Sequence, residues 1–118
     1  MRVLFTETDE AMIALLRALL EGDGHVAVRA PTMAEAARLA GPWGVVLVSG
    51  LPNSWRELDE DDAARLRALT ALAPVVLLAE RPWMEHVPPA DLGVAAIVPK
   101  PFEIDELLDA VRAAGGRG

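Results

Sequence analysis

The sequence has no cysteine, a single lysine and no long apolar run. The lack of cysteine excludes disulfides, thiolate metal ligands and thiol nucleophiles, and it fits a reducing cytoplasm, where we expect the protein to reside. No apolar segment approaches the roughly 18 residues that cross a membrane. The first residues also lack the basic segment and cleavage site of a signal peptide. We therefore expect no membrane contact.

Positive charge is also scarce, because 11 basic residues face 18 acidic ones and the net charge is −7. This balance argues against direct binding of nucleic acid, which needs clustered cations to meet the phosphates. Lys100 stands alone among ten arginines. A bias toward arginine codons explains this imbalance, but a lone lysine can also mark a position that requires a compact ammonium group.

Apolar residues, by contrast, make up 53% of the 118 positions, which is enough for one domain with one interior. Their spacing alternates between strand and helix periods. We expect strands at about residues 2–6, 25–30, 45–48, 75–78 and 95–98. Helices are expected at about residues 9–21, from Thr32 to Gly41, from Asp59 or Glu60 to Ala73, and at 103–113. Residues 81–93 hold three prolines and predict a short, poor helix.

This alternation predicts an α/β domain with a doubly wound, five-stranded parallel sheet of the flavodoxin-like type. We expect the strand order 2-1-3-4-5 and a degenerate fourth helix. Residues 1–114 are assigned to the domain, and residues 115–118 to a flexible tail or truncated linker. Chemistry in such folds lies beyond the carboxyl ends of the strands, here at residues 7–10, 49–52, 79–83 and 99–102.

At these strand ends the sequence resembles the receiver domains of bacterial response regulators, and the resemblance covers essentially the whole chain. The first strand runs into an acidic stretch at residues 7–10, and the third strand ends at Ser49. The run Lys100-Pro101-Phe102 before the last helix matches a characteristic ending of the family. The resemblance implies a non-enzymatic signalling domain of two-component or phosphorelay systems. In that family an aspartate after the third strand accepts a phosphoryl group, and acids after the first strand hold Mg²⁺.

Ser49 occupies the acceptor position that the resemblance implies. No Asp or Glu lies between Glu35 and Glu57, so a shifted alignment restores no acceptor. A serine hydroxyl is a weak nucleophile unless a base activates it, and we expect neither His25 nor His86 beside it. The sequence therefore predicts a degenerate phosphoacceptor and a pseudo-receiver, with Ser49 as a turn or strand-cap residue.

The former acidic pocket reads Glu7, Thr8 and Asp9 where the family carries adjacent aspartates. Glu7 and Asp9 are weak candidates for Mg²⁺ ligands, because a hydroxyl replaces a carboxylate between them and the ion requires several oxygens in near-octahedral array. Acids at the start of a helix are also favoured by the helix dipole. We expect no bound metal and no cofactor.

Two positions that take part in switching within the family have also changed, to Ala79 after the fourth strand and Ile97 in the fifth. Lys100 is the retained pocket lysine. We expect its ammonium to form an ion pair with Glu7 or Asp9 across the former pocket. The resemblance is also compatible with a cis bond between Lys100 and Pro101.

Trp55 and Trp83 follow the third and fourth strands and are candidates for a lid over the pocket, although they can equally cover the top of a small core. The preferred function is a pseudo-receiver that acts through protein contacts of its fourth-helix region, fifth strand and last helix. Its partner is an output domain, another protein or a second copy. Two alternatives remain: a small-ligand sensor that uses the former pocket, and a phosphoryl-accepting regulator with a non-standard acceptor.

Overall fold

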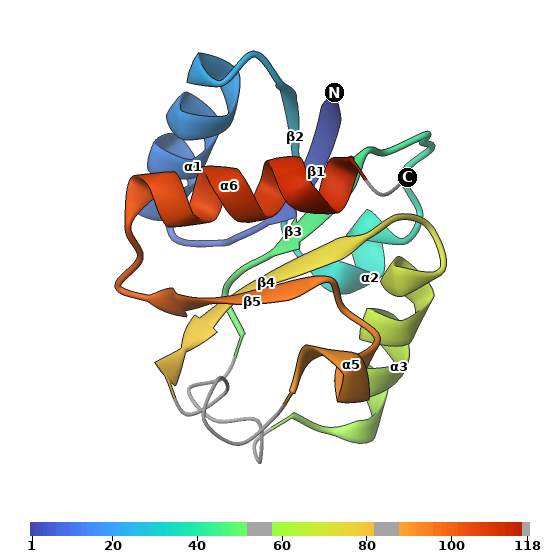
Figure 1. Cartoon of the computed structure of the whole chain (residues 1–118). Coiled ribbons are helices and arrows are strands. Elements are labelled where there is room, and N and C mark those ends of the chain that lie inside the picture. The colour runs from blue at the N-terminus through green and yellow to red at the C-terminus, as the bar shows by residue number, and fades with distance from the viewer. Residues whose placement is uncertain (52–57, 82–87, 117–118) are drawn as a thin grey trace.

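The computed structural model describes residues 1–51, 58–81 and 88–116. Its strands are β1 (Arg2–Thr6), β2 (Val26–Ala30), β3 (Val45–Val48), β4 (Val75–Glu80) and β5 (Ala96–Lys100). They form a parallel sheet in the order β2-β1-β3-β4-β5 (Figure 1). The predicted flavodoxin-like α/β fold is therefore confirmed.

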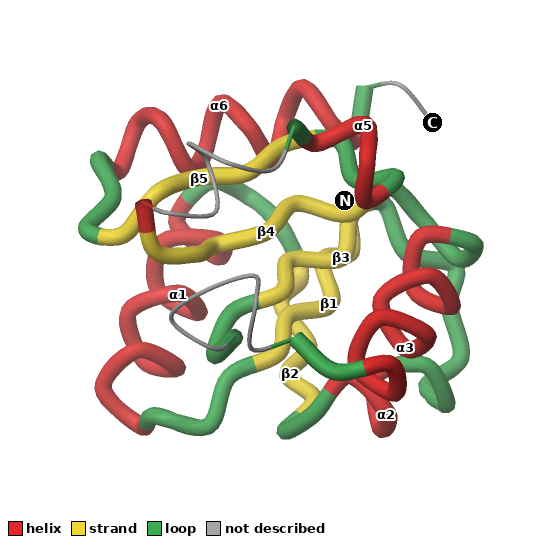
Figure 2. The backbone as a smooth tube through the Cα atoms, turned by 90° about the horizontal axis from the view of Figure 1, so that it is seen from below, coloured by secondary structure: helices red, strands yellow, loops and turns green. Residues whose placement is uncertain are grey.

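The described helices are α1 (Glu10–Gly22), α2 (Met33–Ala36), α3 (Glu60–Thr70), α5 (Pro89–Leu92) and α6 (Ile104–Gly115). Figure 2 shows α1 and α6 on one side of the sheet and α2 and α3 on the other. The four-residue α5 precedes β5 and is the degenerate fourth helix that the prolines predict. Gly93, in the left-handed conformation at φ 71°, ends it. None of these described helices is long and apolar enough to cross a membrane.

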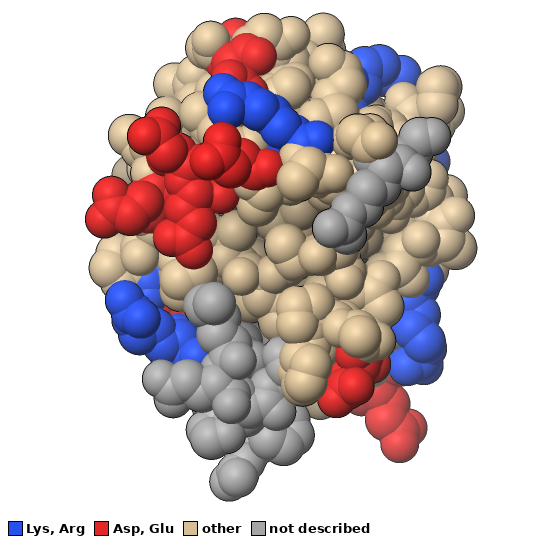
Figure 3. All heavy atoms as spheres, viewed as in Figure 1, with Lys and Arg blue, Asp and Glu red and all other residues tan. Residues whose placement is uncertain are grey.

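The last helix, α6, is amphipathic. It buries Leu107, Val111 and Ala114 against the sheet. Acidic side chains gather at the left of Figure 3, where the first turns of α6 lie, and they include Asp105 and Glu106. The helix runs two residues beyond its predicted end and takes in Gly115, so the predicted tail begins within it. Residues 117–118 lie outside the described part of the chain.

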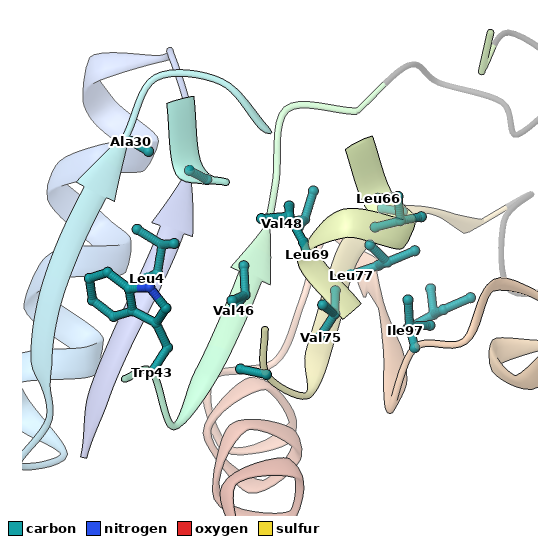
Figure 4. Close-up of a cluster of buried hydrophobic side chains, with 14 residues drawn as sticks. Leu4, Ala30, Trp43, Val46, Val48, Leu66, Leu69, Val75, Leu77 and Ile97 are labelled. Carbon is teal, nitrogen blue, oxygen red and sulfur yellow. The ribbon is translucent and has the colours of Figure 1, made fainter. Parts of the chain in front are cut away.

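Two apolar clusters hold the layers together, one on each face of the sheet. Leu16 and Leu20 of α1 pack with the α6 residues on one face. Leu66 and Leu69 of α3 pack on the other, with the residues drawn in Figure 4. All four residues of β3 are buried, which explains its continuous apolar run: a central parallel strand is covered on both faces.

The second helix is shorter than its sequence predicts. It ends at Ala36, and hydrogen bonds of the i to i+3 type, from Arg38 N to Glu35 O and from Leu39 N to Ala36 O, tighten the chain after it. Further along, Trp43 is 8% exposed and packs in the same cluster as Ala36. The chain leaves the α-helix before Gly41, and Trp43 packs into the core just ahead of β3.

Candidate functional site

The candidate site lies where β1 and β3 end side by side. Thr6 pairs with Val48 in the parallel register, so the next residues of the two strands, Glu7 and Ser49, also lie next to each other. The Ser49 backbone N–H donates to Thr6 Oγ1 at 3.2 Å, and this hydroxyl donates to the Ser49 carbonyl at 3.2 Å. The Ser49 hydroxyl in turn donates to Glu7 Oε1 at 3.2 Å. The acceptor position is thus held in a buried network of hydrogen bonds.

The side chain of Glu7 is fixed from several sides. It is 5% exposed, and its Oε2 accepts a hydrogen bond from the Thr8 backbone N–H at 3.1 Å. Arg29 of β2 donates from Nε to the Glu7 carbonyl at 3.0 Å. Gly50 has φ 77°, a conformation that favours glycine, and a Cβ there would lie 2.7 Å from Glu7 Oε2, so a larger residue would also displace this carboxylate. The sequence did not reveal the bond between Glu7 and Ser49, although the order 2-1-3 places their strands together.

Asp9 acts as the N-cap of α1. Its Oδ1 accepts from the Ala11 backbone N–H at 3.2 Å. Glu7 and Asp9, the weak candidates for metal binding, therefore have their carboxylates engaged with protein donors. No group of three or more metal-ligating side chains gathers within the described ranges. Mg²⁺ is commonly held by one or two carboxylates with waters in its other positions, and here both candidate carboxylates already accept hydrogen bonds from the protein.

The two switch positions stand within the core. Ala79 is 2% exposed near the end of β4, and Ile97 of β5 is 8% exposed in the cluster on the α3 face. Ala79 has no hydroxyl to offer a phosphoryl group. Trp55, Trp83 and His86 lie outside the described residues, and so does the predicted lid.

Lys100 lies at the end of the fifth strand, as expected, but it does not form the expected ion pair. It ends β5, its Cα is paired with Glu80, and its bond to Pro101 is cis, as the resemblance allows. The ion pair with Glu7 or Asp9 is not formed: among the described residues, neither carboxylate lies within 4.0 Å of the ammonium. The two strands are not neighbours in the sheet: β3 and β4 lie between β1 and β5, a separation of roughly 14 Å between their backbones.

A cavity of about 200 Å³ opens beside the network instead. Its walls come from the ends of β1 and β3, from the loop that leads into α2, and from α3. The sequence did not single out Thr32, Met33 or Asp62 as part of this site. The predicted strand order could have indicated Thr32 and Met33, because β2 is next to β1 and the segment after β2 passes the same carboxyl end of the sheet. The lining residues are Thr6, Glu7, Thr8, Pro31, Thr32, Met33, Ser49, Gly50, Leu51 and Asp62.

Fold and strand-end geometry place the chain in the class of flavodoxin-like domains with receiver topology. No family model matches the sequence. The chain is similar to YkoG of Bacillus subtilis (strain 168), an uncharacterized transcriptional regulatory protein, with 31% identity over 115 residues. That match covers 95% of this chain and 50% of YkoG, so the chain spans about half the length of this curated relative.

Solved receiver domains share the fold. The receiver domain of the Francisella response regulator 1452 superposes with a TM-score of 0.78 at 22% identity, covering 98% of this chain and 97% of that one. The non-phosphorylated HemR receiver domain from Leptospira biflexa gives a TM-score of 0.71 at 28% identity, covering 97% and 93% of the two chains. The fold of this chain is thus that of response regulator receiver domains.

Proposed function

We propose that this domain is a pseudo-receiver: a receiver-like signalling domain that works through protein contacts and accepts no phosphoryl group. One observation carries the proposal. Ser49, at the acceptor position, donates its hydroxyl to the buried carboxylate of Glu7. A phosphoacceptor in this fold is a carboxylate that attacks as an anion, and a buried hydroxyl bonded to an acid is a poor nucleophile. Ala79 and the engaged carboxylates of Glu7 and Asp9 support the same conclusion, and the proposal includes no dependence on Mg²⁺.

The proposed contact surface is formed by α5, β5 and α6. Ile104, the first residue of α6, is 50% exposed although it is apolar. Its exposed neighbours in the sequence include the acids Asp105 and Glu106, and Figure 3 shows acidic side chains gathered where the first turns of α6 lie. An exposed apolar residue within a charged rim suits protein recognition. An output domain or separate protein that presents basic groups is the preferred partner, and a second copy is the other candidate. The greater length of YkoG supports an attached output domain.

Intact-mass spectrometry tests the absence of phosphoryl transfer. The protein is incubated with acetyl phosphate and Mg²⁺ beside a receiver domain that carries the acceptor aspartate. We expect the control to gain one phosphoryl group and this protein to gain none. A phosphoryl group that hydroxylamine removes from this protein would identify an acyl phosphate and refute the proposal.

Sedimentation velocity tests whether a second copy of the chain binds the contact surface. Self-association is compared for Ile104→Asp and for Leu72→Asp, a matched change at a residue that is 47% exposed and follows α3. If copies associate through the proposed surface, the Ile104 variant alone weakens association. An equal effect of both changes would exclude this surface from self-association.

A further inference from the structure

Among the residues that the structure describes, the buried carboxylate of Glu7 has no cationic partner. Its two described hydrogen bonds come from neutral donors, the Ser49 hydroxyl and the Thr8 N–H. Among the described residues, no Lys, Arg or His nitrogen lies within 4.0 Å of it, and Arg29 donates to its backbone carbonyl. An ionised carboxylate removed from water is strongly unfavourable unless a cation accompanies it. Within the described part of the chain, the buried carboxylate of Glu7 thus has neutral hydrogen-bond donors and no cationic partner.

Glu7 also lines the cavity of about 200 Å³ at the ends of β1 and β3. Asp62, the other acid among the described lining residues, is paired with Arg65 at 3.3 Å, so Glu7 is the acid of this wall that has no described cationic partner. The hydroxyl-bearing residues Thr8 and Thr32 line the cavity with it, and so do the apolar residues Met33 and Leu51. The cavity therefore combines an anion, polar groups and a small apolar wall. None of its lining residues belongs to α5, β5 or α6, so it is separate from the proposed contact surface.

We propose that this cavity binds a small organic compound that carries one primary ammonium group. A carboxylate offers about four acceptor positions, and two of those of Glu7 are occupied, which leaves positions for an ammonium N–H donor. An ammonium has three donors and no required coordination geometry, so it can bind a carboxylate without the octahedral array of oxygens that Mg²⁺ prefers. The volume is below the roughly 300–1,000 Å³ of pockets for drug-sized ligands, which limits the compound to a few heavy atoms. Met33 and Leu51 would cover its carbon atoms.

Ethanolamine hydrochloride is a suitable probe, titrated at pH 7 while ¹H–¹⁵N NMR spectra follow the backbone amides. KCl and tetramethylammonium chloride at matched ionic strength serve as controls, because neither cation has an N–H donor. We expect saturable shifts at Thr8, Ser49 and Gly50 with ethanolamine only. Equal shifts with KCl or tetramethylammonium, or no saturable shift with ethanolamine, would overturn the proposal.

Two variants locate the charge that binds. Glu7→Gln keeps the shape and removes the charge, and it should weaken ethanolamine binding by about tenfold or more, because a hydrogen bond to a charged group is lost. Glu35→Gln makes the same change on exposed α2 outside the cavity and should leave binding unchanged. Unchanged binding in a folded Glu7→Gln protein would overturn the assignment. If that variant does not fold, the comparison of ethanolamine with KCl and tetramethylammonium on the unaltered protein still tests the proposal. None of these outcomes depends on the proposed contact surface of α5, β5 and α6.

Discussion

Oε1 of Glu7 accepts the Ser49 hydroxyl at 3.2 Å, and each residue is only 5% exposed. The residue at the acceptor position and the first acid of the former pocket thus provide each other with a hydrogen-bond partner. In a receiver that accepts phosphate, both groups must face the incoming phosphoryl donor and its metal ion. Here they form a buried pair in which the serine donates to a carboxylate, and this pair supports the proposal that the domain accepts no phosphoryl group.

The first prediction concerns the strength of this pair. Ser49→Ala removes one hydrogen bond to a buried carboxylate and should lower the free energy of unfolding by about 1–3 kcal/mol in urea titrations. Thr70→Ala is the control, because the Thr70 hydroxyl is exposed and donates only to the Arg67 carbonyl within its own helix. A loss for Ser49→Ala no larger than that of the control would show that the pair contributes little.

The second prediction is that Ser49→Asp does not restore the switch. The new carboxylate would lie beside that of Glu7, and like charges at such a distance destabilise the folded protein. Compared with the uncharged Ser49→Asn, the Asp variant should show a lower thermal midpoint at pH 7, with the difference shrinking in acid as the carboxylates are protonated. Acetyl phosphate should label neither variant, since Ala79 offers no hydroxyl. Efficient labelling of the Asp variant would mean that a working metal site is present.

The third prediction separates two roles for Asp9, a helix cap and a metal ligand. Asp9→Ala removes the acceptor of the Ala11 N–H and should cost about 0.5–2 kcal/mol, whereas Asp9→Ser keeps an N-cap side chain and should recover most of this loss. Chemical denaturation with and without Mg²⁺ measures both effects. A stabilisation by Mg²⁺ that Asp9→Ser abolishes would instead make Asp9 a metal ligand.

The sheet could be predicted from sequence because its signals are local. A run such as Val45–Val48 suits a strand buried on both faces, and right-handed crossovers then restrict the strand order. The end of α2 was not predicted, because the residues after Ala36 are good helix formers and the sequence marks a break only at Gly41-Pro42. The contacts of the site were only partly accessible. Residue types identified Ser49 and Glu7 as site positions, but their hydrogen bond to each other follows from the register of β1 and β3. Lys100 lies on β5, which is not a neighbour of β1.

The fourth prediction follows from the position of Lys100. If its ammonium does not act on Glu7, the effects of Lys100→Met and Glu7→Gln on stability should add within about 0.5 kcal/mol, as they do for separated sites. Urea titrations of the two single variants and the double variant form the required cycle. A coupling of 1 kcal/mol or more would show that the two side chains interact in solution through an arrangement different from this structure.

The last prediction concerns Asp23, at the end of the sheet opposite the candidate site. Asp23 lies in the turn after α1, and its side chain connects this turn to α6. Arg112 of α6 donates to both carboxylate oxygens, from Nε to Oδ2 at 2.9 Å and from its terminal nitrogen to Oδ1, and His25 Nε2 lies 2.9 Å from Oδ2. The hydrogen bond from Arg112, with a smaller contribution from His25, holds the pKa of Asp23 below its usual value against the opposing effect of burial.

A carboxyl whose pKa is lower in the folded protein than in the unfolded chain stabilises the fold above the unfolded pKa, about 3.9, and this contribution is lost as the pH falls through the folded value. The thermal midpoint should therefore fall more steeply below about pH 4 in the unaltered protein than in Asp23→Asn. Asp109→Asn is the matched control, because Asp109 also contacts Arg112, at 3.0 Å, but its side chain is 72% exposed. Because solvent screens exposed pairs, this control should keep the acid slope of the unaltered protein. If Asp23→Asn keeps that slope as well, the connection between α6 and the turn after α1 does not contribute to acid stability.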